Sequence, residues 1–416
     1  MKNSYIQNIL FFLIFLTSIF LVNNEIISHI VWKFPQPFGD YLQQLTWLKC
    51  NYDGYDLYNK NSIECTGQVA FNYGKIFLLT PYNEKLDSFY RYVLPYIIIL
   101  IFTYQVMKII KPQNKATYFL FVLSVINPST ILLIERMNFD IVIFIAIVFV
   151  VYNRYFFINF FVLFYLSLIK FFPAILFVNI FLENKTRSIK TIITMICILI
   201  FSFIIYIMLN LEQYSYLFNN LSVAKAGYHY LFSLNTLPKV LKYMGINYIL
   251  CILTIYSFFI YGLIKIFKKI NYDYLKYNLD IYSSDTRLFM LGGYLSLFCF
   301  IIFSNWFYRE VFLILTFPLI SSICHDYKDK FSRFLINFLI FRYIFLFVYG
   351  YLNINDGINH INDQRIFSYE FISIISIKGL IDFTLMMIIG SMLVFYTNLL
   401  LKDLKHKYKD LFNPLK

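Results

Sequence analysis

Charged residues are scarce in this sequence. Asp, Glu, Lys and Arg make up 14% of its 416 residues, whereas a soluble domain carries about 25%. The mean hydropathy is +0.65, and apolar runs of about 17 residues or more, long enough to cross a bilayer as helices, recur along the whole chain. The composition excludes an ordinary soluble domain and predicts an all-α protein with many transmembrane helices.

Several catalytic and metal-binding patterns are missing as well. The sequence has no GxSxG, P-loop, HExxH or GxGxxG motif, so nothing in it indicates a common hydrolase or nucleotide-binding enzyme. Its six cysteines form no CxxC pair and no Cys/His cluster, and four of them lie in or at the ends of apolar runs, where cysteine is usually an inert small hydrophobe. Cys50 and Cys65 share a polar segment and could form a disulfide in an oxidising compartment. Two free thiols are the alternative.

The positive net charge of +13 does not indicate nucleic-acid binding. Lys and Arg lie mostly in short segments between apolar runs, where basic residues orient transmembrane helices toward the cytoplasm. The segments expected in the cytoplasm hold Lys108/Lys111/Lys115, Lys185/Arg187/Lys190, Lys265/Lys268/Lys269, Lys328/Lys330/Arg333 and Lys405/Lys407/Lys409.

The hydrophobic pattern predicts about ten transmembrane spans in one integral membrane domain, residues 1–416. No small-residue cleavage site follows the first apolar run, which favours an uncleaved anchor over a removed signal peptide. The third run contains Asn127-Pro128-Ser129, which predicts a kink or a broken helix. The predicted spans are 6–22, 92–109, 116–134, 139–152, 191–209, 246–266, 287–303, 311–324, 331–349 and 380–400.

Residues 155–182 differ from these spans. Two short apolar stretches flank Lys170-Phe171-Phe172-Pro173, and neither is long enough to cross a membrane alone, which favours a re-entrant pair of half-helices. The predicted sides alternate consistently only if this segment enters and leaves on the same side. Both termini are then cytoplasmic. The extracytoplasmic side receives a first loop at 23–90 and the turns at 135–140 and 305–310.

Residues 135–140 read Glu-Arg-Met-Asn-Phe-Asp between two apolar runs. Ionisable groups at membrane depth are costly, so they are usually paired, buried in protein or lining a polar cavity. Glu135 and Arg136 could pair with each other or with other spans, and Asp140 could cap the following helix. A charged turn at the membrane surface is an equally good interpretation of this segment.

Three further polar positions are candidates with a plain alternative each. Asp40 could accept a proton at the membrane surface, or it could be an exposed carboxylate or a helix cap. Lys170 could bind phosphate, or its ammonium could simply reach toward water. Arg309 could form a bidentate contact with a phosphate, or it could pair locally with Glu310.

These fragments, in this order, resemble the polyprenol-phosphate-sugar-dependent glycosyltransferases of the GT-C class. The resemblance is strongest to the family 87 group, which includes mycobacterial mannosyltransferases of phosphatidylinositol mannoside synthesis. Two positions depart from the family pattern: Met137 stands where the family usually has Gly, and Gly74 where it usually has Pro. The matching pieces are Gly39-Asp40-Tyr41, Gly54 to Tyr58, Cys50…Cys65…Phe71-Asn72-Tyr73, Glu135 to Asp140, Lys170 to Pro173 and Tyr308-Arg309.

The resemblance implies a GT-C-like fold and an inverting glycosyl transfer. The donor would be a polyprenyl-phosphate-linked sugar, mannose or another hexose or pentose, and the acceptor a lipid or glycan at the outer face of a bacterial inner membrane. Asp40 would be the base, and no metal or other cofactor is implied. Arg309, Lys170 and Arg136 would bind the donor phosphate, whereas Glu135, Asn138, Asp140 and Tyr308 would hold sugar hydroxyls or orient Arg136.

Other functions stay open from the sequence. An O-antigen-type polymerase or ligase is also a protein with many spans, outer loops and essential Arg residues. A lipid or polysaccharide transporter would carry charges at mid-span positions on many helices and show inverted repeats. The sequence places most candidate charges at the ends of predicted spans and shows no repeat, which favours a surface-facing active site. A purely structural membrane protein would not explain the break at Lys170.

Overall fold

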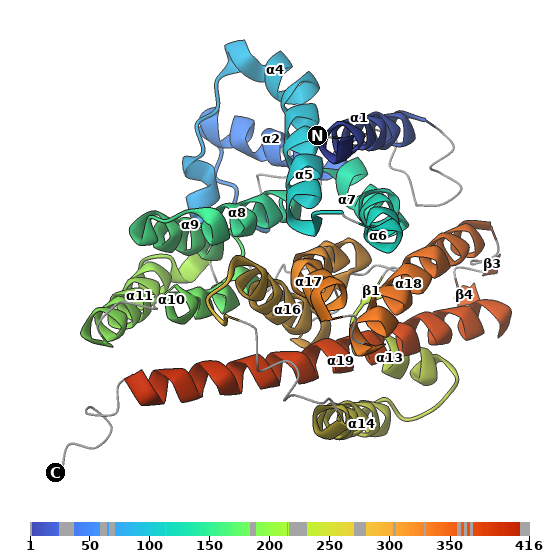
Figure 1. Ribbon diagram of the computed structural model, residues 1–416. Helices are drawn as coiled ribbons and strands as arrows, with labels where there is room; N and C mark the ends of the chain where they lie inside the picture. The colour runs from blue at the N-terminus through green and yellow to red at the C-terminus, as the bar shows by residue number, and fades with distance from the viewer. Residues whose placement is uncertain are drawn as a thin grey trace.

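The computed structural model is almost entirely helical (Figure 1). Two short antiparallel ladders are the strands among the described residues: β1 (Leu231–Phe232) pairs with β2 (Asn305–Trp306), and β3 (Asn359–Ile361) with β4 (Gln364–Ile366). The structure describes residues 2–24, 37–58, 65, 71–112, 114–183, 189–213, 215, 231–269, 280–302, 305–327, 330–355, 359–361, 364–366 and 369–407. Parts of the predicted 23–90 loop and of the basic segment at 185–187 therefore lie outside the described residues.

Among the described residues, each apolar segment predicted as a span is mostly helical. The N-terminal half of the chain forms α1 (Lys2–Asn23), α2 (Gly39–Tyr52), η3 (Lys75–Leu79), η4 (Glu84–Leu86), α4 (Asp87–Tyr92), α5 (Leu94–Ile110), α6 (Lys115–Ile126), α7 (Pro128–Arg136), α8 (Asp140–Tyr152), α9 (Phe156–Ile169), η5 (Phe172–Val178), α10 (Asn179–Leu182) and α11 (Ile189–Leu209). The C-terminal half forms α13 (Thr236–Tyr243), α14 (Tyr248–Lys269), α16 (Ser284–Ile302), η7 (Phe307–Thr316), α17 (Phe317–Tyr327), α18 (Lys330–Asn355) and α19 (Tyr369–Lys407).

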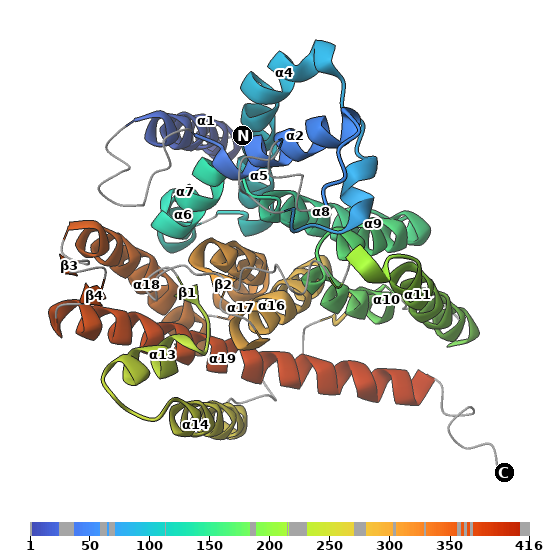
Figure 2. The same cartoon turned by 180° about the vertical axis from the view of Figure 1, so that it is seen from behind.

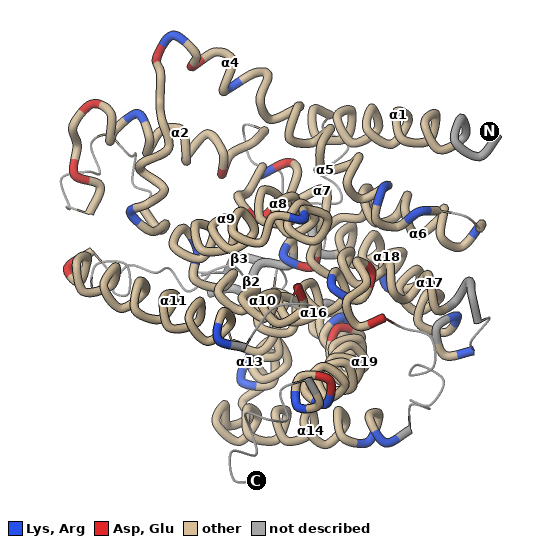
Figure 3. Tube along the Cα trace, turned by 60° about the vertical axis from the view of Figure 1, so that its left-hand side comes forward, with Lys and Arg blue, Asp and Glu red and all other residues tan. Residues whose placement is uncertain are grey.

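Length and composition make this a membrane protein. Among the described residues, five helices are long and apolar enough to span a bilayer, or up to seven if each of two bent helix pairs counts as one span. Helices α11 and α14 are almost wholly exposed in the isolated chain, which is what a lipid-facing helix requires. Charges are sparse along the helices, and basic residues mark the end of α14 (Figure 3).

The Asn127-Pro128-Ser129 interruption breaks a helix, as the sequence predicts. Helix α6 ends at Ile126, α7 begins at Pro128, and the two bend by 40°. Pro cannot donate a backbone hydrogen bond inside a helix, so the break needs another partner for the free backbone groups. The Asn127 side chain supplies it: its oxygen accepts from the amides of Ser129 and Thr130, and its nitrogen donates to the Leu123 and Ser124 carbonyls.

Residues 155–182 fold back on themselves as a hairpin. Helix α9 runs to Ile169, the chain turns at Lys170, and η5 and α10 pack back along α9. Polar contacts close the base of the hairpin, because Asn159 Nδ2 donates to Glu183 Oε1, and Arg287 of α16 reaches both Glu183 and Asn179 at 2.9 and 3.1 Å. The segment therefore begins and ends at the same level, and Lys170 lies at its tip.

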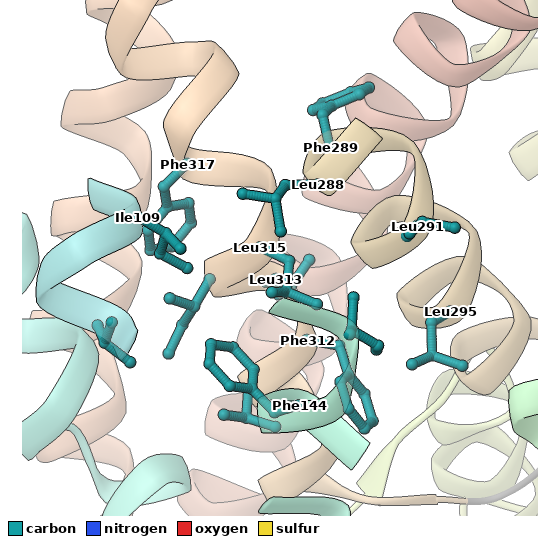
Figure 4. Close-up of a cluster of buried hydrophobic side chains, with 14 of the residues drawn as sticks. Ile109, Phe144, Leu288, Phe289, Leu291, Leu295, Phe312, Leu313, Leu315 and Phe317 are labelled. Atoms are coloured by element: carbon teal, nitrogen blue, oxygen red, sulfur yellow. The ribbon is translucent and has the colours of Figure 1, made fainter. Parts of the chain in front are cut away.

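One hydrophobic core joins α1 to α19. Its centre lies between α16, η7 and the helices of the N-terminal half (Figure 4). Helix α16 and η7 approach each other closely at Gly292 of α16, where a Cβ atom would meet Leu315 Cβ at 2.4 Å and the Phe312 carbonyl oxygen at 2.8 Å. Helix α19 runs along one side of the molecule, with α14 packed on its outer face (Figures 1 and 2).

The segment after α1 forms a small second core above the main one. Trp47, Phe71, Tyr73 and Phe77 are buried there and pack edge to face or tilted. A disulfide joins Cys50 to Cys65, with Cα atoms 6.0 Å apart. By closing a loop of this size, a disulfide contributes about 3 kcal/mol of stability. This core and the disulfide fix α2, whose first turn carries Asp40.

Candidate functional site

Asn138 is the centre of a polar network that joins most of the candidate residues found in the sequence. Its Nδ2 donates to Asp40 Oδ2 at 2.6 Å and to the Tyr308 hydroxyl at 3.1 Å. Its Oδ1 accepts from Lys170 Nζ at 2.9 Å and from the Asp140 amide at 3.2 Å. One buried amide thus joins side chains from α2, α8, η7 and the tip of the α9 hairpin.

We refer to Asp40, Arg136, Asn138, Asp140, Lys170, Tyr308 and Arg309 as the Asn138 cluster. These seven residues come from four separate parts of the sequence, and hydrogen bonds or ion pairs join each of them to another member. All of them were candidates from the sequence. The structure therefore brings the predicted base and the three predicted phosphate ligands into one place.

At one end of the Asn138 cluster, Arg136 holds Asp40. Arg136 Nε donates to Asp40 Oδ1 at 2.9 Å, and Nη2 of the same guanidinium donates to the same oxygen. Asp40 Oδ2 receives the Asn138 amide and retains an accepting position among the described residues. About a fifth of the Asp40 side chain is exposed, so the carboxylate is partly accessible.

At the other end, two cations share one carboxylate. Lys170 Nζ lies 2.6 Å from Asp140 Oδ1, and Arg309 Nε lies 3.2 Å from Asp140 Oδ2. Asp140 is fully buried, whereas Lys170 and Arg309 are partly exposed. These three side chains carry a net charge of +1, and an anion that approaches from the exposed side meets two cations held at a fixed spacing.

Aromatic rings surround the two cations. Lys170 Nζ lies 5.1 Å from the centre of the Tyr73 ring, and the Arg309 guanidinium lies 4.7 Å from that of Phe172. Rings at such distances stabilise a cation without neutralising its charge. Burial, followed by the negative charges of Asp40 and Asp140, raises the pKa of the Tyr73 phenol well above its usual range. Tyr73 therefore stays neutral beside Lys170.

Two unusual backbone positions shape the site. Phe38, just before α2, has φ 65°, and its amide donates to the Glu135 carbonyl at 2.5 Å, which places Asp40 beside Arg136. Met137, just after α7, has φ 50°. Glycine is favoured in this left-handed region, so Met137 occupies the conformation that a Gly at this position, as in the resembling family, would adopt without strain.

Gly74 also has a structural reason. Its amide donates to the Ile169 carbonyl at 2.9 Å, and a Cβ atom there would lie 1.8 Å from the Leu168 carbonyl oxygen. Proline has no amide hydrogen and brings additional ring atoms. The Gly that replaces the expected Pro therefore lets the 71–74 segment pack directly on the end of α9, next to Lys170.

The surroundings of several predicted site residues differ from one another. Glu135 and Asp140 are fully buried, which favours the orienting role of the two that the sequence allows over contact with a sugar hydroxyl. Asp140 orients Lys170 and Arg309 instead of Arg136, and its side chain is not a helix cap. Arg136 was expected at the phosphate, but its guanidinium is engaged by Asp40.

The expected local pair of Arg309 and Glu310 does not form. Glu310 belongs to a second ionic group with Arg342, Lys378 and Asp382, which we call the buried quartet. Arg342 Nη2 lies 2.6 Å from Glu310 Oε2 and 2.8 Å from Asp382 Oδ1. Lys378 Nζ lies 2.6 Å from Asp382 Oδ2 and 3.3 Å from Glu310 Oε1. The sequence signal for this group is a charge inside an apolar run, since Arg342 lies within the predicted 331–349 span.

The sequence also missed Tyr73 and Gln44. Gln44 Nε2 donates to the Tyr73 hydroxyl at 3.2 Å, which fixes the ring under Lys170. Tyr73 belongs to the Phe71-Asn72-Tyr73 motif, which was recognised without a role. Among the described residues, no group of three or more His, Cys, Asp or Glu side chains is placed to hold a metal ion.

Known proteins give no further assignment. No protein-family model, no curated protein and no solved structure matches this chain. The chemistry of the Asn138 cluster is therefore the basis for any functional conclusion.

Proposed function

We propose that this protein is a membrane glycosyltransferase of the GT-C class. It transfers a sugar, mannose or another hexose or pentose, from a polyprenyl-phosphate donor to a lipid or glycan acceptor. One observation carries the proposal: an accessible carboxylate, Asp40, lies in the same network as two partly exposed cations, Lys170 and Arg309, that converge on one carboxylate. A base and a site for a leaving phosphate are the two requirements of this reaction.

In the proposed reaction, Asp40 accepts the proton of the acceptor hydroxyl. Arg136 occupies Oδ1, so Oδ2 is the oxygen that faces the acceptor. The acceptor oxygen forms a bond to the anomeric carbon while the bond from that carbon to the phosphate oxygen breaks, with inversion. The phosphate leaves as an anion, and Lys170 and Arg309 compensate its charge.

Asp140 and Asn138 have positioning roles in this scheme. Asp140 keeps both cations at a fixed spacing. Asn138 sets the separation between Asp40 and Lys170, since it contacts both side chains through the two ends of one amide. Tyr308, which is buried, accepts a hydrogen bond from Asn138 and so helps to hold this amide in place.

The proposal includes a membrane arrangement. Nine spans result when α1, α8 and the two bent pairs are counted with the five long helices, and the predicted 311–324 segment, which lies in η7 and α17, would be the tenth. The hairpin at 155–182 is re-entrant, because its base closes on itself through Asn159 and Glu183. The Asn138 cluster then lies at the outer face of a bacterial inner membrane, with both termini in the cytoplasm, as the basic segments require.

The test is transfer by purified protein. Wild type and Asp40→Asn are incubated with radiolabelled polyprenyl-phosphate mannose and a lipid extract of the host, and label in new glycolipid is counted. Asp87→Asn is the matched control, because Asp87 is another carboxylate bound by an arginine, Arg91 at 2.6 Å, outside the Asn138 cluster. We expect transfer by wild type and Asp87→Asn and its loss in Asp40→Asn.

Each other outcome has a definite meaning. Transfer by Asp40→Asn at the wild-type rate removes Asp40 as the base but keeps the enzyme. Failure of wild type with a panel of polyprenyl-phosphate sugars rejects the proposed function. Transport of a lipid-linked sugar across vesicles without transfer would then favour a transporter, and growth of a polymer on a lipid-linked primer would favour an O-antigen-type polymerase.

A further inference from the structure

Three consecutive residues at the start of η7 contact three different parts of the molecule. Tyr308 meets Asn138, Arg309 meets Asp140, and Glu310 meets Arg342 and Lys378. Successive side chains of a 3₁₀ helix point about 120° apart, which explains how neighbours in sequence reach opposite sides. A movement of η7 that displaces Glu310 therefore also displaces Arg309.

The buried quartet lies on the side of η7 away from the Asn138 cluster. Its four side chains are at most 3% exposed and carry two positive and two negative charges. Arg342 comes from α18, and Lys378 and Asp382 come from α19. Within the buried quartet, α18 and α19 therefore contact η7 through Glu310.

Lys378 holds the chain on both sides of Tyr308 and Arg309. Besides Glu310, its ammonium donates to the Leu231 carbonyl at 3.2 Å. Leu231 lies in β1 opposite Trp306 of β2, just before η7. The same lysine therefore anchors the strand pair that precedes the two site residues and the glutamate that follows them.

A closed group of buried charges tolerates little displacement. Each charge has lost its water, so a shift that lengthens one ion pair leaves a charge without compensation, which costs several kcal/mol. Such a group therefore favours one arrangement of its side chains, whereas two apolar surfaces in contact can shift relative to each other at a lower cost. η7 needs this restraint, since 3₁₀ helices longer than about four residues are uncommon and have poor hydrogen-bond geometry.

We propose that Arg342, Lys378 and Asp382 are positioning residues for the anion site, by which we mean Lys170 and Arg309. The three residues hold Glu310, and through Glu310 they fix where Arg309 meets the donor phosphate. This inference rests on the proposed function. It assigns the C-terminal helices α18 and α19 a role in donor binding.

A double-mutant cycle between the buried quartet and Arg309 tests the proposal. Equilibrium binding of radiolabelled polyprenyl monophosphate is measured for wild type, Asp382→Asn, Arg309→Lys and the combination. If the quartet acts through Arg309, Asp382→Asn weakens binding about tenfold in wild type and less than about twofold in the Arg309→Lys background, since residues that act as a unit are not additive. An equal factor in both backgrounds overturns the proposal.

Two further variants distinguish a loss of binding caused by a displaced Arg309 from one caused by lower stability. The variant Arg342→Met/Asp382→Leu removes one cation and one carboxylate together and leaves Glu310 paired with Lys378, so it folds even if Asp382→Asn does not. Its binding loss is expected to disappear in the Arg309→Lys background. Leu393→Ala, a buried apolar change on the same helix, lowers stability without touching the quartet, and any loss of binding that it causes is expected to be additive with Arg309→Lys.

The two proposals fail in different ways. If wild type does not bind polyprenyl monophosphate at all, the proposed function fails first and the positioning role with it. If wild type binds but the cycle is additive, the function stands and the positioning role is wrong.

Discussion

The Asn138 cluster and the buried quartet are built from the same kinds of side chains, yet they differ in access and in charge balance. Asp40, Arg136, Lys170 and Arg309 have side chains that are 11–20% exposed. The quartet side chains are at most 3% exposed. In the Asn138 cluster two cations share Asp140, whereas the quartet pairs two cations with two carboxylates.

This difference separates a site from a structural element. The quartet's two cations and two carboxylates compensate one another in charge and are closed off from solvent. Accessible cations that outnumber their carboxylate can accept an additional anion. The two groups are joined at Arg309 and Glu310, so a single short helix takes part in both. The predictions below ask whether the contrast holds, beginning with the largest expected effect.

The quartet is expected to be a stability element. Arg342→Met leaves Lys378 as the one cation of the quartet for the two carboxylates of Glu310 and Asp382. The variant should lower the free energy of unfolding by about 3–5 kcal/mol, the usual cost of breaking a buried ion pair. Chemical denaturation in detergent measures it. Lys111→Met, which breaks the exposed pair with Asp285, is the control and should change stability by less than about 1 kcal/mol. Equal losses would erase the contrast between the groups.

The Asn138 amide is expected to be essential for transfer. Asn138→Asp keeps the shape but replaces the donor to Asp40 Oδ2 by an oxygen, so two carboxylates face each other. We expect transfer to fall about 100- to 1,000-fold, as on removal of a key donor in an active site. Asn51→Asp, a change of the same kind at an exposed position of α2, is the control. Transfer by Asn138→Asp at the control rate would contradict the central place of this amide.

The close approach at Gly74 is expected to set the position of Lys170. A Cβ atom in Gly74→Ala collides with the Leu168 carbonyl, so α9 or the 71–74 segment must move. Misplacement by about 1 Å can cost about 100-fold in rate, and we expect a loss of this size in transfer assays. Gly54→Ala is the control: it strains a positive φ in the same outer segment but meets no atom within 4 Å. Similar losses in both variants would point to loop strain instead.

The smallest effect is expected for a change that keeps the charge of the anion site. Arg309→Lys preserves the cation but loses the planar fork that can bind Asp140 and a phosphate together. Transfer should fall about tenfold, mainly through a higher donor KM, since Arg309 contacts the donor phosphate in the proposed reaction. Arg91→Lys, at the Asp87 pair, should leave the donor KM unchanged. A wild-type donor KM in Arg309→Lys would remove Arg309 from the phosphate site.

The sequence predicted the elements well where hydropathy decides them. The break at Asn127-Pro128-Ser129 and the turn at Lys170 follow from local rules, because Pro and short apolar stretches cannot continue a spanning helix. The sequence predicted the last span as 380–400, but α19 runs from Tyr369 to Lys407. The charged residue Lys378 shortens an apolar window, although it does not end a helix when it is paired with Asp382.

The pairing of charges could not be read from the sequence. Arg309 and Glu310 are neighbours, and a local pair was a reasonable expectation, but η7 directs them to different helices. The partners of Glu310 come from α18 and α19, so the pairing depends on tertiary packing that no local pattern encodes. The members of the Asn138 cluster were identified because each interrupts an apolar run or lies in a resembling motif. Tyr73 lies in a resembling motif that was given no role, and Gln44 lies in the polar segment and lacked either signal.

The most direct test of the account asks whether the exposed cations bind the donor phosphate. The melting temperature of the purified protein is measured with and without polyprenyl monophosphate. Ligand at a hundredfold excess over Kd stabilises the folded state by about 2.7 kcal/mol, so wild type and Lys111→Met should melt at a higher temperature with the lipid, and Lys170→Met/Arg309→Met should not. An equal rise in the double variant, or no rise in wild type, would contradict the assignment of the Asn138 cluster as the site.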